Sequence, residues 1–378
     1  MVECYVDRGR CLGVDLLEKG GEAGQVEVAE FGSLCDESRQ DHKKTCDPVG
    51  GEPTSQRHDD SLRCDGQPIK DPLRVVNPKW PLLVVIHEPV GLTSDMGQSS
   101  TPEIHFIANL WTLVEHPSSE CEWTLEEKLK AVKAAGFQGV NHPGTPELKE
   151  LLDQHELGFS GLFDANDPAE FAALIKAQVD CGSTTINVQL CDHDTPLEEA
   201  VEKTVLLMEE DERQDANTHL EMHRDTCTET PEKAYAIADG YRKATGKILR
   251  MNMDHSHPAI IKHLRPAEFV ERLLDRPELL QNGNLLHCRP FNGHHCQVPV
   301  TDGQGALSVE FRDYLPFVEA AFTCWLQGPR PHNELWVVPE LGPVASGYGI
   351  STWPPVWEDC IVAKDELQAV WNRVLEVA

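Results

Sequence analysis

The sequence predicts an α/β fold, a parallel (β/α)8 TIM barrel that occupies residues 104–378. Short apolar runs typical of buried parallel strands alternate there with longer amphipathic runs typical of helices. Eight of each fit this segment, whose length is close to the roughly 250 residues of such barrels. A doubly wound open sheet is the alternative, but no glycine-rich phosphate-binding loop follows the first strand run. We therefore expect a closed barrel.

The predicted strands are short and rich in aliphatic residues, as expected for strands covered on both faces. They are residues 104–113, 138–141, 157–163, 184–190, 218–222, 247–253, 284–286 and 334–338. Helical runs separate and follow them at residues 125–135, 146–155, 168–180, 197–213, 231–244, 266–281, 308–326 and 364–377.

The helix starts carry local signals. Thr124 is followed three residues later by Glu127, the pattern of a capping box. Four other helices begin with a capping residue and then proline, which is favoured at the first helical position. These capping residues are Thr145, Asp167, Thr195 and Thr230. The signals support the alternation of strands and helices that a barrel needs.

Residues 1–103 differ from the rest of the chain. They are rich in glycine, serine, cysteine and charged residues, and they show little helical or strand periodicity. We expect a poorly structured N-terminal extension, disordered or loosely packed, with a small accessory domain as the alternative. The apolar run at residues 81–87 is the exception and could form a single strand.

Composition limits the functional classes. The 378 residues include 33 basic and 63 acidic ones, a formal charge of −30 that argues against a nucleic-acid partner. Thirteen cysteines form no zinc-finger spacing, and we expect reduced thiols in a cytoplasmic protein. No run reaches the roughly 18 apolar residues of a membrane span, and the N-terminus does not resemble a secretory signal. We expect a cytoplasmic protein with no membrane partner.

Acidic residues or a histidine stand at the ends of the last four predicted strands. These residues are Glu221, Asp254, His287 and Glu340. Active sites of parallel barrels lie at the carboxyl ends of the strands, and four consecutive strands would bring these side chains together. Three carboxylates and an imidazole suit a hard divalent ion better than a thiolate-rich structural zinc site. We expect one divalent metal ion, with Mn²⁺ preferred and Mg²⁺, Co²⁺, Fe²⁺ or Zn²⁺ as alternatives.

Three motifs in residues 104–378 resemble the xylose-isomerase-like TIM barrel superfamily of sugar isomerases, sugar epimerases and inosose dehydratases. Asp254-His255-Ser256-His257 matches the Asp-x-x-His pattern of that family, and His287-Cys288-Arg289 resembles its His-x-Arg or His-x-Lys element. Glu340 stands where the last ligand is expected. The resemblance implies that Glu221, Asp254, His287 and Glu340 are metal ligands. It also implies a small sugar or polyol substrate and is compatible with a homo-oligomer.

The resemblance further implies proton abstraction beside a carbonyl, with the metal stabilising the resulting enediolate. Glu221 and Glu340 would serve both as ligands and as the acid–base pair. Return of the proton to the opposite face gives epimerisation, return to the neighbouring carbon gives isomerisation, and loss of hydroxide gives dehydration. The sequence leaves these outcomes open. It therefore predicts a metal-dependent isomerase, epimerase or dehydratase acting on a sugar, polyol or related hydroxy-carbonyl compound.

Several polar side chains near the strand ends are candidates for binding the substrate. They are His142, Gln189, His223, Arg224, His257 and Arg289. Two alternative functions stay open: a non-catalytic barrel that binds a ligand or acts as a subunit, and a metal-dependent hydrolase like endonuclease IV. The hydrolase is disfavoured because that group holds a zinc cluster with more histidines, and Asp164 and its neighbours on the third strand supply none.

Overall fold

The computed structural model describes residues 4–7, 10–13 and 101–377. Two short strands near the N-terminus, β1 (Cys4–Asp7) and β2 (Arg10–Gly13), pair antiparallel. The remainder of the expected extension, including the apolar run at residues 81–87, lies outside the described residues. The division of the chain at residue 103 therefore stays a prediction.

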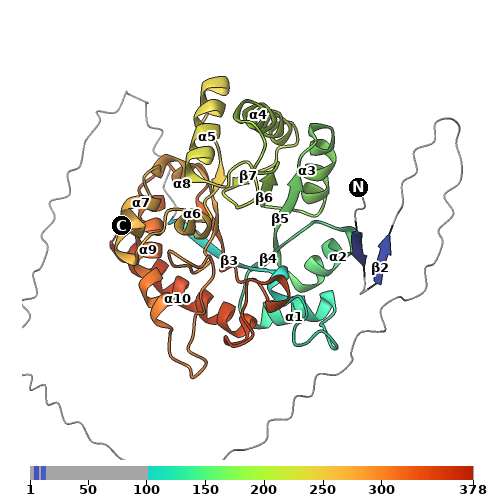
Figure 1. The fold of residues 1–378 in the computed structure, drawn as a ribbon, viewed down its shortest axis with the longest axis vertical. Helices are drawn as coiled ribbons and strands as arrows, with labels where there is room; N and C mark the ends of the chain where they lie inside the picture. The colour runs from blue at the N-terminus through green and yellow to red at the C-terminus, as the bar shows by residue number, and fades with distance from the viewer. Residues whose placement is uncertain (1–3, 8–9, 14–100, 378) are drawn as a thin grey trace, which may run out of the picture. The chain divides into compact units, whose positions relative to one another are not determined.

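Eight parallel strands form a nearly closed barrel in the order β8-β7-β6-β5-β4-β3-β10-β9, and helices surround them (Figure 1). The strands are β3 (Glu103–Asn109), β4 (Gly139–His142), β5 (Gly158–Ala165), β6 (Thr185–Leu190), β7 (Thr218–Glu221), β8 (Met251–Asn252), β9 (Leu285–His287) and β10 (Glu334–Val338). The predicted TIM barrel is confirmed. The predicted first strand was too long, because residues Leu110–Leu113 form the 3-10 helix η1.

The barrel has one interface without a strand ladder, which we call the seam. It lies between β8 and β9, the two ends of the strand order. Side chains bridge it instead. The Oδ1 atom of Asn252 accepts a hydrogen bond from the backbone N–H of His287 at 2.9 Å. Further down, the backbone N–H of Asn284 donates to Nε2 of His219 at 3.1 Å. The seam is thus held by individual polar contacts that point mutations can remove.

The helices are α1 (Leu125–Ala134), α2 (Pro146–His155), α3 (Phe171–Asp180), α4 (Leu197–Arg213), α5 (Pro231–Thr245), α6 (Ser256–Ile261), α7 (Phe269–Leu273), α8 (Pro277–Asn282), α9 (Val309–Leu326) and α10 (Val356–Val377). Three more 3-10 helices are η2 (Pro168–Glu170), η3 (Pro266–Glu268) and η4 (Val344–Ser346). The capping box of Thr124 and Glu127 is present, and Thr145 caps α2 as expected.

The last helix, expected at residues 364–377, begins earlier, at Val356. Two other predictions about helices were wrong. Thr195 does not cap α4, because its hydroxyl bonds to Asp192 and the helix begins after Pro196 without a side-chain cap. The expected helix at residues 266–281 is divided into η3, α7 and α8. Pro277 explains the second break, since its ring cannot continue a preceding helix and instead starts α8. These differences do not change which strand ends carry the candidate site residues.

The inner face of the barrel is unusually polar. Because side chains alternate along a strand, one residue in two faces inward. Four buried asparagines occupy inward positions, and we call them the inward asparagines: Asn109, Asn141, Asn187 and Asn252. The apolar core lies between the strands and the surrounding helices. A smaller apolar group of Ile107, Leu285, Trp336 and Val338 fills the inside below the polar residues.

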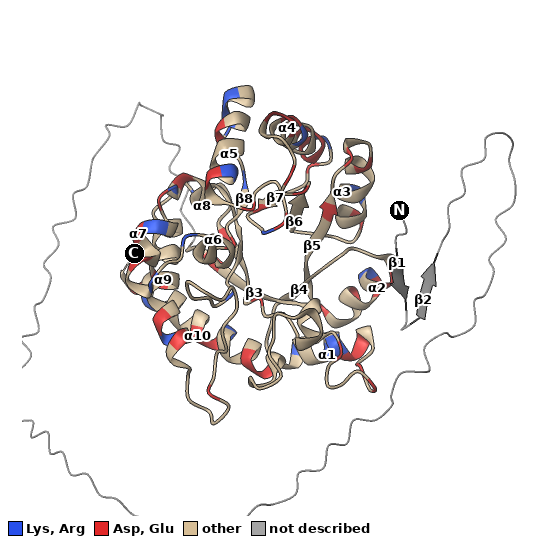
Figure 2. Ribbon diagram, viewed as in Figure 1, with Lys and Arg blue, Asp and Glu red and all other residues tan. Residues whose placement is uncertain are grey.

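Acidic residues are frequent on the helices, for example on α1 and α4 (Figure 2), and most of their side chains on these two helices are exposed, with Glu210 and Asp211 of α4 as buried exceptions. Their exposure places much of the negative charge in solvent, where it is tolerated. None of the helices in the described ranges combines the length and the apolar character needed to cross a membrane.

Candidate metal centre

The four predicted ligands meet at one end of the barrel. Glu221 ends β7, His287 ends β9, and Asp254 and Glu340 each follow a strand by two residues, β8 and β10. One ligand atom from each residue lies within 4.8 Å of those of the other three, and all four residues are buried. The strand ends therefore produce the convergence that the sequence predicted.

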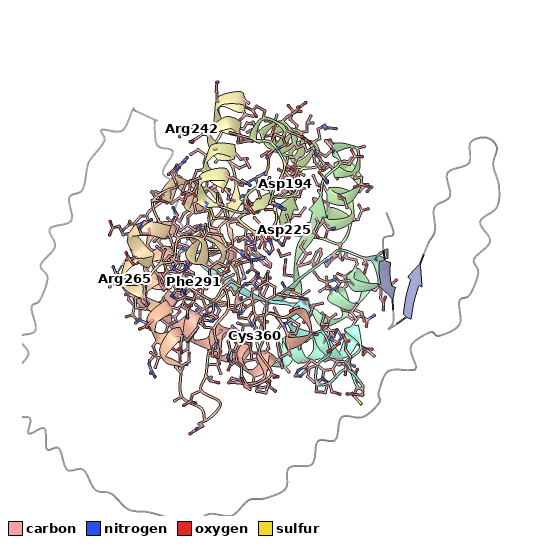
Figure 3. The ribbon with its side chains drawn as sticks, in the orientation of Figure 1. Asp194, Asp225, Arg242, Arg265, Phe291 and Cys360 are labelled. Atoms are coloured by element: carbon pink, nitrogen blue, oxygen red, sulfur yellow. The ribbon has the colours of Figure 1, made fainter. Side chains whose placement is uncertain are left out.

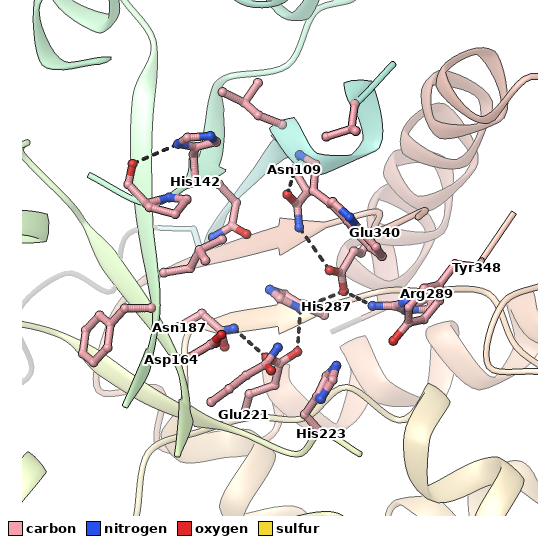
Figure 4. Close-up of a pocket in the computed structure, with 18 of the residues that line it drawn as sticks. Asn109, His142, Asp164, Asn187, Glu221, His223, His287, Arg289, Glu340 and Tyr348 are labelled. Carbon is pink, nitrogen blue, oxygen red and sulfur yellow. Dashed lines mark hydrogen bonds and ion pairs between the residues drawn. The ribbon is translucent and has the colours of Figure 1, made fainter. Parts of the chain in front are cut away.

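His287 lies between Glu221 and Glu340, and Arg289 lies beside Glu340 (Figure 4). His287 Nδ1 is 3.1 Å from Glu221 Oε1 and 3.0 Å from Glu340 Oε2. The guanidinium of Arg289 contacts Glu340 Oε2 at 2.6 Å and lies 3.5 Å from Asp254 Oδ2. Burial in such a place is costly for any charge that is not compensated, and these contacts compensate the buried carboxylates.

The donor set fits a divalent cation. Asp254 Oδ2 and both ring nitrogens of His287 are buried without a well-aligned hydrogen bond, although Arg289 lies near the first and two carboxylates lie near His287 Nδ1. Buried polar atoms are normally satisfied. Three carboxylates face one guanidinium and one imidazole, so negative charge remains in excess. Oxygen and imidazole donors in this ratio match the preferences of Mn²⁺ or Mg²⁺. The four side chains thus have unused donor capacity directed at a common point.

Ion pairing overrides burial in the ionisation of the cluster. Burial alone would raise the pKa of Glu340, but Arg289 and His287 outweigh it and bring the pKa to about 2. Burial would lower the pKa of His287, yet Glu340 and Glu221 raise it to about 10. The pKa of Asp254 falls well below its usual value because His257 and Arg289 outweigh the effect of burial. The carboxylates are therefore ionised.

Two of the inward asparagines fix the glutamates. Asn109 Nδ2 donates to Glu340 Oε1 at 3.0 Å, and Asn187 Nδ2 donates to Glu221 Oε2 at 2.7 Å. Each glutamate has one oxygen held by an amide and the other directed at His287. The sequence analysis missed both asparagines. Their signal was a polar side chain inside an apolar strand, which is costly unless it has a buried partner.

A cavity of about 650 Å³ opens above the cluster. Its far wall is formed largely by apolar side chains that follow β3 and lie on β5, including Leu110, Trp111 and Phe163. Its two long basic side chains are already paired: Lys128 with Glu122, and Arg289 with Glu340. The described lining thus leaves no lysine or arginine unpaired for an anionic substrate.

The candidate substrate-binding residues fall into two groups. His142, Gln189, His223 and Arg289 line the cavity. Arg224 does not line it and instead donates to the hydroxyl of Tyr348 at 2.8 Å. His257 is completely buried, with its Nε2 atom 3.3 Å from Asp254 Oδ2, so it supports a ligand rather than the cavity wall. Contact with substrate stays a prediction for all six.

Asp164 and Tyr348 line the cavity and were not predicted as site residues. Asp164 stands on β5 near Glu221 and His223, and burial, followed by the charge of Glu221, raises its pKa. The ring of Tyr348 lies 4.5 Å from the guanidinium of Arg289. Tyr348 comes from a loop after η4, where the sequence has no periodic signal.

Residues at the rim pair with one another rather than with the cluster. His193 bonds to Asp225 at 2.8 Å and lies 3.4 Å from Asp194, and all three are exposed. Asp194 and Asp225 are labelled in Figure 3. The neighbouring Asp225 and Glu221 therefore have different environments despite their closeness in sequence. Only the buried carboxylates contribute to the candidate centre.

No protein-family model matches the chain, and no curated protein sequence matches it. Several solved structures are similar. A xylose isomerase-like TIM barrel protein from Mycobacterium smegmatis in complex with magnesium is 15% identical, with a TM-score of 0.44, over 71% of this chain and 97% of that one. D-allulose 3-epimerase from Methylomonas sp. is 14% identical, with a TM-score of 0.45, over 72% and 98%.

A probable 3-DHS dehydratase from Bacillus anthracis is 13% identical, with a TM-score of 0.42, over 71% of this chain and 99% of that one. The similar structures thus include xylose isomerase-like barrels, as the sequence resemblance implied. At these values the likeness carries no argument about activity. The strand order and the geometry of this chain's own residues carry the reasoning about its site.

Proposed function

We propose that this chain is a divalent-metal-dependent isomerase, epimerase or dehydratase acting on a sugar, polyol or related hydroxy-carbonyl compound. The observation that carries the proposal is the convergence of Glu221, Asp254, His287 and Glu340 beneath an open cavity. A structural ion would not need such a cavity. A buried carboxylate cluster at the carboxyl end of barrel strands is suited to catalysis.

A bound divalent ion would supply Lewis-acid stabilisation for negative charge on the substrate oxygens. The protein supplies the proton transfer. Glu221 ends β7 and Glu340 follows β10, and both contact the Nδ1 atom of His287, at 3.1 and 3.0 Å. One glutamate takes the proton beside the carbonyl and the other returns it. Because Asn187 and Asn109 hold one oxygen of each, the other oxygens are oriented before the substrate binds.

The cavity supports an uncharged substrate. Its lysine and arginine side chains are paired, its carboxylates would repel an anion, and neutral donors and acceptors such as Gln189 and Asn141 also line it. These groups suit the hydroxyls of a sugar or polyol, and Trp111 offers an apolar face. Cytoplasmic location, the choice of Mn²⁺ and assembly as a homo-oligomer remain parts of the proposal that the sequence alone motivates.

The first test is the metal content of the purified protein, measured by plasma mass spectrometry. We expect about one divalent ion per chain in the wild type, as the four-residue donor set holds a single ion. The double variant Glu221→Gln, Asp254→Asn should lose it. The matched control Asp225→Asn, Glu229→Gln removes two carboxylates outside the cluster and should keep it. A wild type that binds none of Mn²⁺, Mg²⁺, Co²⁺, Fe²⁺ or Zn²⁺ would refute the proposal.

The second test is proton exchange. The Mn²⁺-loaded protein is incubated with a panel of ketoses and oxidised polyols in D₂O, and deuterium incorporation beside the carbonyl is followed by NMR. We expect exchange with at least one compound, its loss in Glu340→Gln, and its retention in the control. A metal-loaded protein that exchanges no compound would favour the non-catalytic barrel.

A further inference from the structure

A chain of amides connects the seam to the metal centre. Asn252 stands on β8 opposite Glu221 on β7, and Asn187 stands on the next strand, β6. Asn252 Nδ2 donates to Asn187 Oδ1 at 2.9 Å, and Asn187 Nδ2 donates to Glu221 Oε2 at 2.7 Å. On the other side, Asn252 Oδ1 accepts from the backbone N–H of His287 at 2.9 Å. Three successive hydrogen bonds therefore connect residues on four strands: His287, Asn252, Asn187 and Glu221.

The direction of every bond in this chain is fixed. A backbone N–H can only donate, so the atom of Asn252 that faces His287 must be its oxygen. The amide nitrogen of Asn252 then faces Asn187, which must present its oxygen in return. The nitrogen of Asn187 is left to face Glu221. The amide orientations thus follow from the backbone of β9 rather than from a choice between similar atoms.

The residues joined by these hydrogen bonds are buried. Asn252 is 0% exposed, Asn187 is 3% exposed and Glu221 is 1% exposed. Water therefore cannot easily replace a missing donor, and a lost bond leaves an unsatisfied group in a low-dielectric interior. One of these bonds, from the His287 N–H to Asn252 Oδ1, crosses the seam, where no strand ladder fixes β8 against β9. Asn252 therefore supplies one of the individual contacts that join the two strands in place of a ladder.

We propose that Asn187 and Asn252 are positioning residues that hold Glu221 and the strand of His287 in the geometry of the metal centre across the seam. This inference rests on the proposed function and assigns roles to two residues that are not ligands. Asn252 sets the spacing between the two sides of the seam. Asn187, which is bonded to Asn252, holds the carboxylate of Glu221 in position.

Three variants separate these roles. Asn252→Asp keeps an acceptor for the His287 N–H but cannot donate to Asn187. Asn252→Leu removes the bonds of Asn252 to His287 and to Asn187. Asn187→Leu removes the bonds of Asn187 to Asn252 and to Glu221 and leaves the bond between Asn252 and the His287 N–H. The control is Asn217→Asp, which loses donations to Thr184 O and Asn284 Oδ1 at the opposite end of the barrel. It removes partly buried amide bonds without touching the centre.

The first measurement is the Kd for Mn²⁺ by isothermal titration. We expect all three variants at Asn187 and Asn252 to bind Mn²⁺ about 10- to 100-fold more weakly, the usual effect of losing a group that orients a ligand. Asn217→Asp should retain the wild-type Kd even if its melting temperature falls. Circular dichroism in the near ultraviolet checks folding, and Asn252→Asp and Asn187→Leu decide the matter if Asn252→Leu does not fold.

The second measurement is hydrogen exchange at the His287 amide in the metal-free protein. The wild type and Asn252→Asp should protect it, while Asn252→Leu should exchange it about fivefold faster, for a bond worth about 1 kcal/mol. Unchanged Kd values in the variants, or equal protection in Asn252→Leu, would overturn the inference alone. A wild type that binds none of Mn²⁺, Mg²⁺, Co²⁺, Fe²⁺ or Zn²⁺ would overturn the proposed function, and with it the role of Asn187 and Asn252 at the metal centre.

Discussion

Arg289 offers the sharpest test of how charge is balanced in the metal centre. Its guanidinium is 2% exposed and lies 2.6 Å from Glu340 Oε2 and 3.5 Å from Asp254 Oδ2. Replacement by leucine in Arg289→Leu keeps an apolar stem but removes the positive charge. Two buried carboxylates then lose a counter-charge that solvent cannot supply.

The expected cost follows from the remaining contacts. Removing one partner of a buried ion pair lowers the free energy of unfolding by about 3–5 kcal/mol. Glu340 keeps Asn109 and His287, and Asp254 keeps the backbone N–H of Ser256. We therefore expect the lower end, about 3 kcal/mol, which corresponds to a fall in melting temperature of about 6–12 °C. Saturating Mn²⁺ should narrow the difference, because the ion supplies positive charge to the same carboxylates and binds the folded state.

The assay is differential scanning calorimetry with a chelator and then with excess Mn²⁺. The control is Arg265→Leu, whose side chain is 81% exposed and pairs with Glu268 at 2.9 Å. A surface pair contributes about 0–1 kcal/mol, so this variant should melt close to the wild type. If Arg289→Leu in chelator melts within about 2 °C of Arg265→Leu, the reasoning about buried charge is refuted.

Three further predictions concern features outside the cluster. Cys227 donates to the thiolate of Cys191 and lowers the pKa of Cys191 to about 7, so alkylation of Cys191 by iodoacetamide should rise through that pH. Mass spectrometry of the labelled peptide should show that the midpoint of this rise lies at higher pH in Cys227→Ala. An unchanged midpoint would exclude Cys227 as the cause of the lowered pKa. Thr145→Ala removes the hydroxyl that caps α2 and should cost about 1 kcal/mol in urea unfolding, whereas a loss near zero would show that the cap is dispensable. A Cβ at Gly139 would lie 2.5 Å from the carbonyl oxygen of Gly158, so Gly139→Ala should destabilise the barrel by about 1–3 kcal/mol, and an unchanged melting temperature would contradict that contact.

The sequence predicted the barrel well because its signals are local. The capping box at Thr124 and the proline starts of α2 and α5 act within one helical turn, so they can be read without knowing the fold. The convergence of Glu221, Asp254, His287 and Glu340 followed from one rule, that strand ends of a barrel meet. Periodicity and end position were sufficient for these residues.

Other features depend on contacts that the sequence does not encode locally. The hydrogen bond between Asn252 and Asn187 joins residues that are 65 positions apart in the sequence, and only the strand register brings them together. Tyr348 reaches Arg289 from an irregular loop. Thr195 has the same local signal as Thr145, but its hydroxyl donates to the carboxylate of Asp192 instead of capping a helix. Such choices between competing partners are decided by three-dimensional distance, which residue type and spacing leave undetermined.

The inward asparagines have a consequence for folding that is separate from catalysis. Shifting any strand by one residue would exchange its two faces, because side chains alternate. Asn109, Asn141, Asn187 and Asn252 would then be pressed into the apolar layer beneath the helices, and each unpaired amide would cost about 1–3 kcal/mol. The same groups that surround the candidate metal centre therefore penalise one-residue misalignments of the strands that carry them.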